Sequence, residues 1–136
     1  NTEKVTRLRE TLISGLSTIE HARLNGDREQ RVPGTVNFCF EGIEGESLLL
    51  LLDRKGLAAS SGSACTSGSL DPSHVLLALA LPPEVAHGSL RLSVGEYNTD
   101  AEMAYIVENV RQVVAYLRSI SPVWDELETG ARPHLI

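Results

Sequence analysis

The sequence predicts an α+β fold, in which a small antiparallel or mixed sheet is covered by helices. Three observations support this prediction. Short segments carry the β-branched and aromatic content, or the apolar–polar alternation, of β-strands. Longer segments repeat apolar residues at helical spacing and carry capping residues at their ends. The 136 residues, 42% of them hydrophobic and 22% charged, fit one globular domain.

The first half of the chain contains two predicted helices and a strand. An amphipathic helix covers about the first twenty residues, and a turn follows at Asn25-Gly26. Residues 35–40, TVNFCF, have the composition of a strand. A second helix follows, with acidic residues at its start, basic residues at its end, and Gly56 to stop it. The apolar positions of the first helix are Val5, Leu8, Leu12, Leu16 and Ile19.

The second half begins with a short buried strand, residues 57–60, that leads into a Ser/Gly-rich loop. Asp71 and Pro72 then favour the start of another helix, which Pro82-Pro83 ends. Residues 89–95, SLRLSVG, alternate as a half-buried strand does. Asn98 or Thr99 caps a long helix, and a short final helix precedes an irregular end. The apolar face of the long helix comprises Met103, Ile106, Val107, Val110, Val113, Val114 and Leu117.

Charge and cysteine content exclude several classes of protein. A formal net charge of −6 without a basic run argues against a nucleic-acid-binding surface. The longest strongly apolar run, SLLLLLD, is too short to span a membrane. Two cysteines, Cys39 and Cys65, are too few for a disulfide scaffold, so two free thiols in a reducing cytoplasm are expected.

Cys65 is the first candidate for chemistry. It lies in SSGSACTSGS, a loop of small residues that allow a thiolate exposure and movement. The alternative is a surface turn with an incidental thiol. A catalytic Cys–His pair with His74 or His87 is disfavoured, because no Asn or Asp is placed to orient the histidine. The spacing of cysteines and histidines predicts no metal site, and no phosphate-binding glycine loop is present.

Arg91 is the second candidate, because it lies within the predicted strand SLRLSV. An arginine that alternates with apolar residues can point into a cleft, where its guanidinium group binds a carboxylate through two parallel hydrogen bonds. The alternative is a structural ion pair. Arg91 alone leaves both interpretations open.

Together these segments resemble a known family. LNGD, VPGTVNFCF, EGESLLLLL, SSGSACTSGSLDPSHVL, HGSLRLSVG, YNTDAEM and SPVWDEL occur in the order found in cysteine desulfurases of the NifS/IscS type. The SSGSACTS segment is the most specific, and it resembles the subgroup with a long cysteine loop. The resemblance implies the C-terminal small domain of a fold-type I pyridoxal-phosphate-dependent transferase, over residues 1–136.

The family implies roles for both candidates. Cys65 corresponds to the residue that takes sulfur from L-cysteine as a persulfide, with release of alanine, and Arg91 to the residue that binds the substrate carboxylate. The implied sulfur acceptor is an iron–sulfur scaffold protein, the implied assembly a homodimer, and the implied compartment the cytoplasm. The residues of the implied mobile loop around Cys65 are Ser61, Gly62, Ser63, Ala64, Thr66 and Ser67.

The sequence departs from the family in its lysines. Only Lys4 and Lys55 are present, and neither stands in the His-Lys context that attaches pyridoxal phosphate in the family. We therefore expect that the large cofactor-binding domain is absent from this chain, and that the chain alone binds no cofactor and is inactive. Glu96 also departs, since many relatives carry a basic residue there.

Two further interpretations remain open at this stage. One is a non-catalytic module that docks an iron–sulfur scaffold through its acidic end, WDELETGARPHLI. The other is a sulfur-relay protein that uses Cys65 without pyridoxal phosphate. The second needs a resolving thiol, and Cys39 is expected to be buried in its strand.

Overall fold

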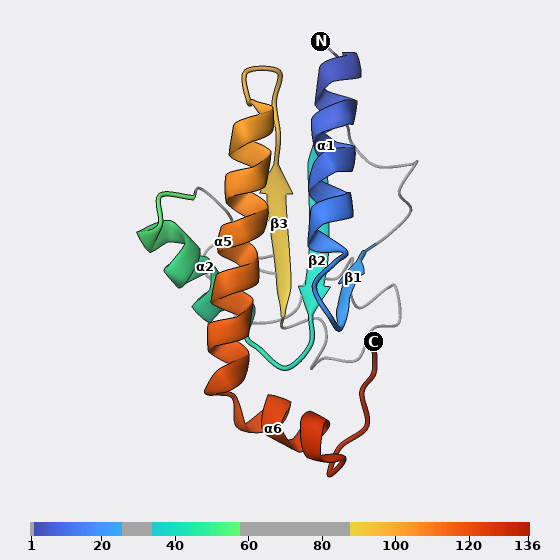
Figure 1. Cartoon of the computed structure of the whole chain (residues 1–136), viewed down its shortest axis with the longest axis vertical. Coiled ribbons are helices and arrows are strands. Elements are labelled where there is room, and N and C mark those ends of the chain that lie inside the picture. The colour runs from blue at the N-terminus through green and yellow to red at the C-terminus, as the bar shows by residue number, and fades with distance from the viewer. Residues whose placement is uncertain (1, 26–33, 58–87) are drawn as a thin grey trace.

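A computed structural model describes residues 2–25, 34–57 and 88–136. In this part of the chain, three strands form one antiparallel sheet, and helices lie against one of its faces (Figure 1). The predicted α+β class is thus confirmed. The elements, in chain order, are α1 (Thr2–Leu16), β1 (Ala22–Leu24), β2 (Thr35–Phe40), α2 (Gly45–Arg54), β3 (Ser89–Ser93), α5 (Asp100–Ser119) and α6 (Pro122–Thr129).

The strands lie in the order β1-β2-β3, with β2 in the centre. Asn37 of β2 is paired with Arg91 of β3, and Cys39 of β2 is paired with Arg23 of β1. Two of the three predicted strands, at residues 35–40 and 89–95, are confirmed as β2 and β3, but β1 was missed. It has only three residues and lies in a segment that reads as a turn, so no alternation over four or more residues marks it.

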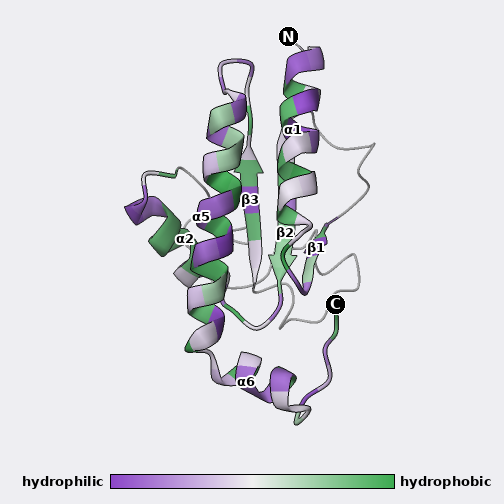
Figure 2. Ribbon diagram, viewed as in Figure 1, coloured by the Kyte–Doolittle hydropathy of each residue, from purple (hydrophilic) through white to green (hydrophobic). Residues whose placement is uncertain are grey.

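The hydrophobic core lies between the sheet and the helices. Figure 1 shows α1 and α5 side by side across the strands, and Figure 2 shows hydrophobic residues along these helices and strands. Alternate residues of the strands point into this core, as the pleat of a sheet requires. The largest fully buried side chains are Phe38, Phe40, Leu8, Leu12, Ile13, Leu16, Leu48, Leu52, Leu90, Met103 and Val36.

The helix ends follow the local signals in most places. Thr99 caps α5 with a capping box, in which Glu102 N–H donates to Thr99 Oγ1 and Thr99 N–H donates to Glu102 Oε1. Gly56, just after α2, has a φ of +80° that suits glycine. The helix predicted over about the first twenty residues ends at Leu16, while Ile19 beyond it is still buried.

The C-terminal segment folds back under the sheet. Helix α6 runs across the lower end of α5, and the following residues return toward β1 (Figure 1). None of the described helices is long and apolar enough to cross a membrane. Two other predicted elements fall on residues that the structure does not describe. The strand predicted at residues 57–60 does so from residue 58 onward, and the helix predicted from Asp71 does so entirely.

Candidate functional site

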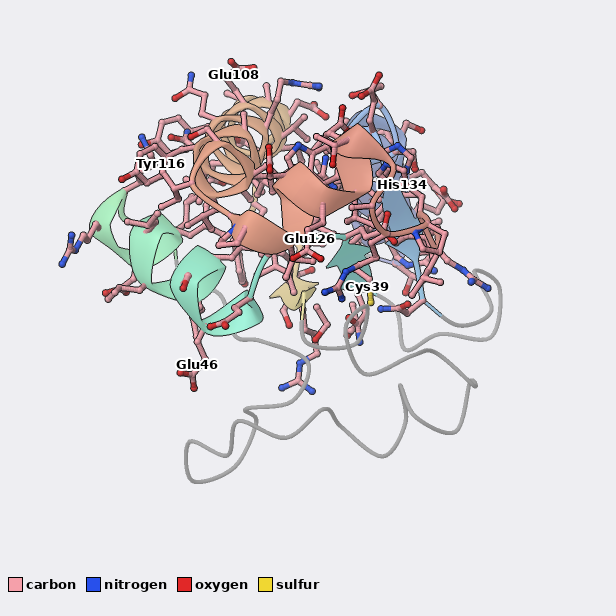
Figure 3. All side chains as sticks on the ribbon, turned by 90° about the horizontal axis from the view of Figure 1, so that it is seen from below. Cys39, Glu46, Glu108, Tyr116, Glu126 and His134 are labelled. Atoms are coloured by element: carbon pink, nitrogen blue, oxygen red, sulfur yellow. The ribbon has the colours of Figure 1, made fainter. Side chains whose placement is uncertain are left out.

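The face of the sheet opposite α1 and α5 carries polar side chains. Leu90 and Leu92 of β3 are buried in the core, so Arg91 between them points to the opposite face. Figure 3 shows Cys39 on this side of the strands, away from the helices. We call this surface the polar sheet face. By register and alternation, its members are Arg23, Asn37, Cys39, Ser89 and Arg91.

Arg91 is partly exposed at the centre of β3, opposite Asn37. The strand is held by its ladder to β2 on one side and by the core beneath it, so the base of this side chain has a fixed position. A guanidinium group in such a place can bind a carboxylate bidentately. Its role in substrate binding stays a prediction.

Cys39 is fully buried and unsuited to nucleophilic chemistry. Asn25 Nδ2 lies 2.9 Å from the thiol sulfur and donates to it, and the thiol donates to Asn25 Oδ1 at 3.3 Å. Desolvation by burial raises the pKa of Cys39 to about 11. The thiolate is therefore scarce at neutral pH. The expected burial of Cys39 is confirmed, which disfavours it as a resolving thiol.

Ser89, the cross-strand neighbour of Cys39, is also buried. Its hydroxyl makes no hydrogen bond to any residue in the described part of the chain. A buried hydroxyl without a partner is costly, so Ser89 is an unsatisfied polar group on the polar sheet face.

Cys65 and the loop residues around it lie outside the described residues. So do His74 and His87, the two histidines considered as partners of Cys65. The structure therefore neither brings Cys65 to Arg91 nor separates them. The roles predicted for the loop are carried forward as proposals.

The polar sheet face does not fit covalent attachment of pyridoxal phosphate. Its basic side chains are Arg23 and Arg91, and an arginine cannot serve as the attachment lysine. Lys4 lies in α1 on the other side of the sheet, and Lys55 follows the end of α2. Among the described residues, this face thus carries two arginines but no lysine for the cofactor.

Sequence reasoning missed Arg118, a buried residue that organises the lower end of the fold. Its guanidinium donates to the carbonyl oxygens of Glu41 at 3.0 Å, Glu20 at 2.7 Å and His21 at 3.0 Å. It also stacks 4.0 Å from the Trp124 ring centre. Desolvation lowers the pKa of Arg118 to about 10. On the sequence it is one charged residue near a helix end, with no local signal of these distant partners.

Comparison with known proteins gives a consistent result. The aminotransferase class-V family matches residues 1–106. A cysteine desulfurase of Azotobacter chroococcum is 51% identical over 125 residues, which are 91% of this chain and 31% of that protein. The cysteine desulfurase NifS of Azotobacter vinelandii is 50% identical over the same number, again 91% and 31%. A probable mitochondrial cysteine desulfurase of Schizosaccharomyces pombe is 48% identical over 126 residues, or 93% and 25%.

Solved structures show the same fold. A NifS-like protein from Rickettsia africae superposes with a TM-score of 0.73 at 23% identity, covering 85% of this chain and 29% of that one. Another NifS-like protein gives a TM-score of 0.71 at 28% identity, covering 85% and 28%. The chain thus spans about a third or less of the length of the relatives it matches.

Proposed function

Because this chain belongs to the aminotransferase class-V family, we propose that it forms the C-terminal small domain of a cysteine desulfurase. The observation that carries the proposal is about 50% identity, over nine-tenths of the chain, to proteins named for that activity. The parent protein would take sulfur from L-cysteine and release L-alanine. This chain would supply the sulfur-accepting thiol and the carboxylate-binding arginine.

The thiol in this proposal is that of Cys65. Its thiolate attacks the sulfur of L-cysteine, and an S–S bond forms as the C–S bond of the substrate breaks. The electron pair of that bond passes to the substrate carbon, and a proton then completes alanine. The glycines and serines around Cys65, from Ser61 to Ser67, allow the persulfide to move toward an acceptor.

Arg91 holds the other end of the substrate. A carboxylate paired with its guanidinium would place L-cysteine over the polar sheet face, where the core beneath β3 keeps the arginine in position. Pyridoxal phosphate supplies the electron acceptor for C–S cleavage. Since the polar sheet face offers no lysine, the cofactor would be attached elsewhere in the parent protein.

The partners in the proposal are those that the resemblance to cysteine desulfurases of the NifS/IscS type implies. The persulfide sulfur would pass to an iron–sulfur scaffold protein, and the parent would act as a homodimer in the cytoplasm. Two acidic residues of α6, Asp125 and Glu128, are exposed, which is compatible with docking to such a scaffold through this end.

The test is single turnover of the parent protein with L-cysteine. Wild-type protein is expected to release one alanine per site and to gain a persulfide on the peptide that contains Cys65, detected by mass spectrometry. Cys65→Ser should lose both signals, whereas Cys39→Ser, the matched change at the buried thiol, should keep them. Persulfide formation in Cys65→Ser, or no alanine from the wild type, would refute the proposal.

A further inference from the structure

The fold brings four chemically active side chains together where the C-terminal segment returns to the sheet. His21 precedes β1, Glu41 follows β2, Glu128 lies in α6, and His134 lies in the segment after α6. We call this group the histidine cluster. Figure 3 shows His134 at the lower end of the molecule, beside α6. The histidine cluster adjoins the end of the polar sheet face that holds Arg23 and Cys39, because His21 and Glu41 lie two positions from these residues.

The two imidazole rings are stacked. Their centres are 3.6 Å apart with an angle of 9° between the planes, and Trp124 packs against both edge to face. Ligand atoms of His21, His134 and Glu128 all lie within 4.8 Å of one another. Two ligands on one tetrahedral zinc ion are about 3.4 Å apart. Rotation of the exposed Glu128 side chain and a tilt of the rings would close this gap.

Hydrogen bonds leave one nitrogen of each histidine available. His21 Nδ1 lies 2.7 Å from the carbonyl oxygen of Ile136, and a carbonyl only accepts, so Nδ1 carries the proton. His134 Nδ1 lies 2.6 Å from Glu41 Oε1, whose carboxylate also accepts from the backbone N–H of Leu135. With the proton on Nδ1, the Nε2 of each ring is the nitrogen whose lone pair can bind a cation.

Glu41 supports His134 in the way that a hydrogen-bonded carboxylate supports a metal-binding histidine. A carboxylate that accepts from the far nitrogen of a histidine fixes its tautomer and raises its basicity as a ligand. On the other side of the same ring, His134 Nε2 lies 3.7 Å from Glu128 Oε1. Glu41 is only 3% exposed, so its charge is weakly screened.

The charges also favour a cation. Glu41 and Glu128 contribute two negative charges near Arg118, which carries one positive charge and contacts Trp124 and three carbonyl oxygens. The cluster thus keeps a negative balance when both histidines are neutral. Two imidazole nitrogens and one carboxylate are a ligand set typical of zinc and neighbouring divalent metals.

We propose that His21, Glu128 and His134 bind one divalent transition-metal cation of the zinc class, with Glu41 orienting His134. The ion would join the segment after α6 to the start of β1 and to α6. It would leave a coordination position for water. The inference is independent of the proposed desulfurase activity, since the histidine cluster contains neither Cys65 nor Arg91.

The test is calorimetric titration of the parent protein with Zn²⁺ at neutral pH, in a Cys65→Ser background that removes a competing thiol ligand. One equivalent of zinc is expected to bind. Glu128→Gln should weaken binding tenfold or more, and Glu41→Gln by 10–100-fold. Glu108→Gln, which removes the same charge from an exposed position on α5, should bind as the background does. Visible absorption of bound Co²⁺ gives a second readout of low coordination number.

Histidine variants complete the test. His134→Asn and His21→Asn should abolish tight binding, and asparagine suits the φ of +52° at His21. Since Glu128 is exposed, Glu128→Gln stays folded even if a histidine variant does not. Equal zinc affinity in Glu128→Gln and the background, or no saturable binding, would overturn the proposal. Either result leaves the alanine-release assay unaffected, so the two proposals fail separately.

Discussion

At the scale of single residues, the surroundings of a thiol decide what it can do. Cys39 is buried and hydrogen-bonded to Asn25, and desolvation by burial raises its pKa and keeps the thiol protonated at neutral pH. Cys65 has mostly small and polar neighbours in the sequence. The same side chain therefore serves packing at one position and is proposed for chemistry at the other.

The raised pKa of Cys39 predicts how stability depends on pH. Its folded-state pKa of about 11 exceeds its ordinary value of 9.0, so the contribution is complete below pH 9 and is lost as pH rises through 11. A shift of this size corresponds to at most about 3 kcal/mol. Urea unfolding at pH 8 and at pH 10.5 measures it. The stability advantage of wild type over Cys39→Ala should shrink at the higher pH.

This comparison between variants cancels the titration of tyrosines and lysines, which are present in both proteins. An advantage of wild type that is the same at both pH values would mean that Cys39 is not protected from ionisation by burial.

Arg91→Lys should weaken binding of L-cysteine by the parent protein. Lysine keeps the charge but loses the second parallel hydrogen bond to a carboxylate. Loss of one charge-assisted bond is worth about 2 kcal/mol, so KM should rise at least tenfold with a smaller change in kcat. Steady-state alanine release measures both. Arg54→Lys, the same change at an exposed position of α2, should leave KM unchanged. Equal KM values for both variants would show that Arg91 does not bind the substrate carboxylate.

At the scale of elements, β3 and α5 show how local sequence places functional groups. The alternation of β3 puts Leu90 and Leu92 into the core and therefore Arg91 on the polar sheet face. Helix α5 begins at a capping box directly after the turn that follows β3. The capping box fixes the start of α5, and α5 covers the face of the sheet opposite the polar sheet face.

Thr99→Ala should destabilise the fold by about 1 kcal/mol, because it leaves the N–H of Glu102 without its capping partner. Urea unfolding of the parent protein or of this chain measures the change. Thr11→Ala is the matched control, since it makes the same replacement in the exposed middle of α1. Alanine is favourable within a helix, so this control should not lose stability. A loss equal to that of Thr99→Ala would show that capping is not the cause.

At the scale of the whole molecule, the described helices α1 and α5 pack on one face of the sheet, and the polar sheet face lies on the opposite side. The buried hydroxyl of Ser89 and the partly exposed Arg91 both lie there. The large cofactor-binding domain of the proposed parent is the partner that this arrangement suits. A carboxylate-binding arginine and an attachment lysine would then come from different domains.

The polypeptide of residues 1–136, prepared alone, should not release alanine from L-cysteine even with added pyridoxal phosphate. Its polar sheet face has no lysine to attach the cofactor. Alanine release is compared with that of the parent protein and of its Cys65→Ser variant. Turnover by the short polypeptide above the level of Cys65→Ser would show that this chain holds a complete active site.

Local signals in the sequence were sufficient for most elements and for the family. Strands β2 and β3, the cap of α5 and the burial of Cys39 follow from periodicity, capping chemistry and apolar context, all of which act over a few residues. The family follows from motifs in a characteristic order. The side of the strand on which Arg91 lies could be predicted for the same reason, since its alternation with leucines spans only a few residues.

Features built from distant segments could not be found in this way. Strand β1 exists because β2 offers it a partner, and Arg118 is buried because the carbonyl oxygens of three separate residues surround it. The histidine cluster draws on three distant stretches of the chain, which contain His21, Glu41, and Glu128 with His134. Spacing along the sequence carries no signal of such contacts, because they form only when α6 and the following residues fold back against the sheet.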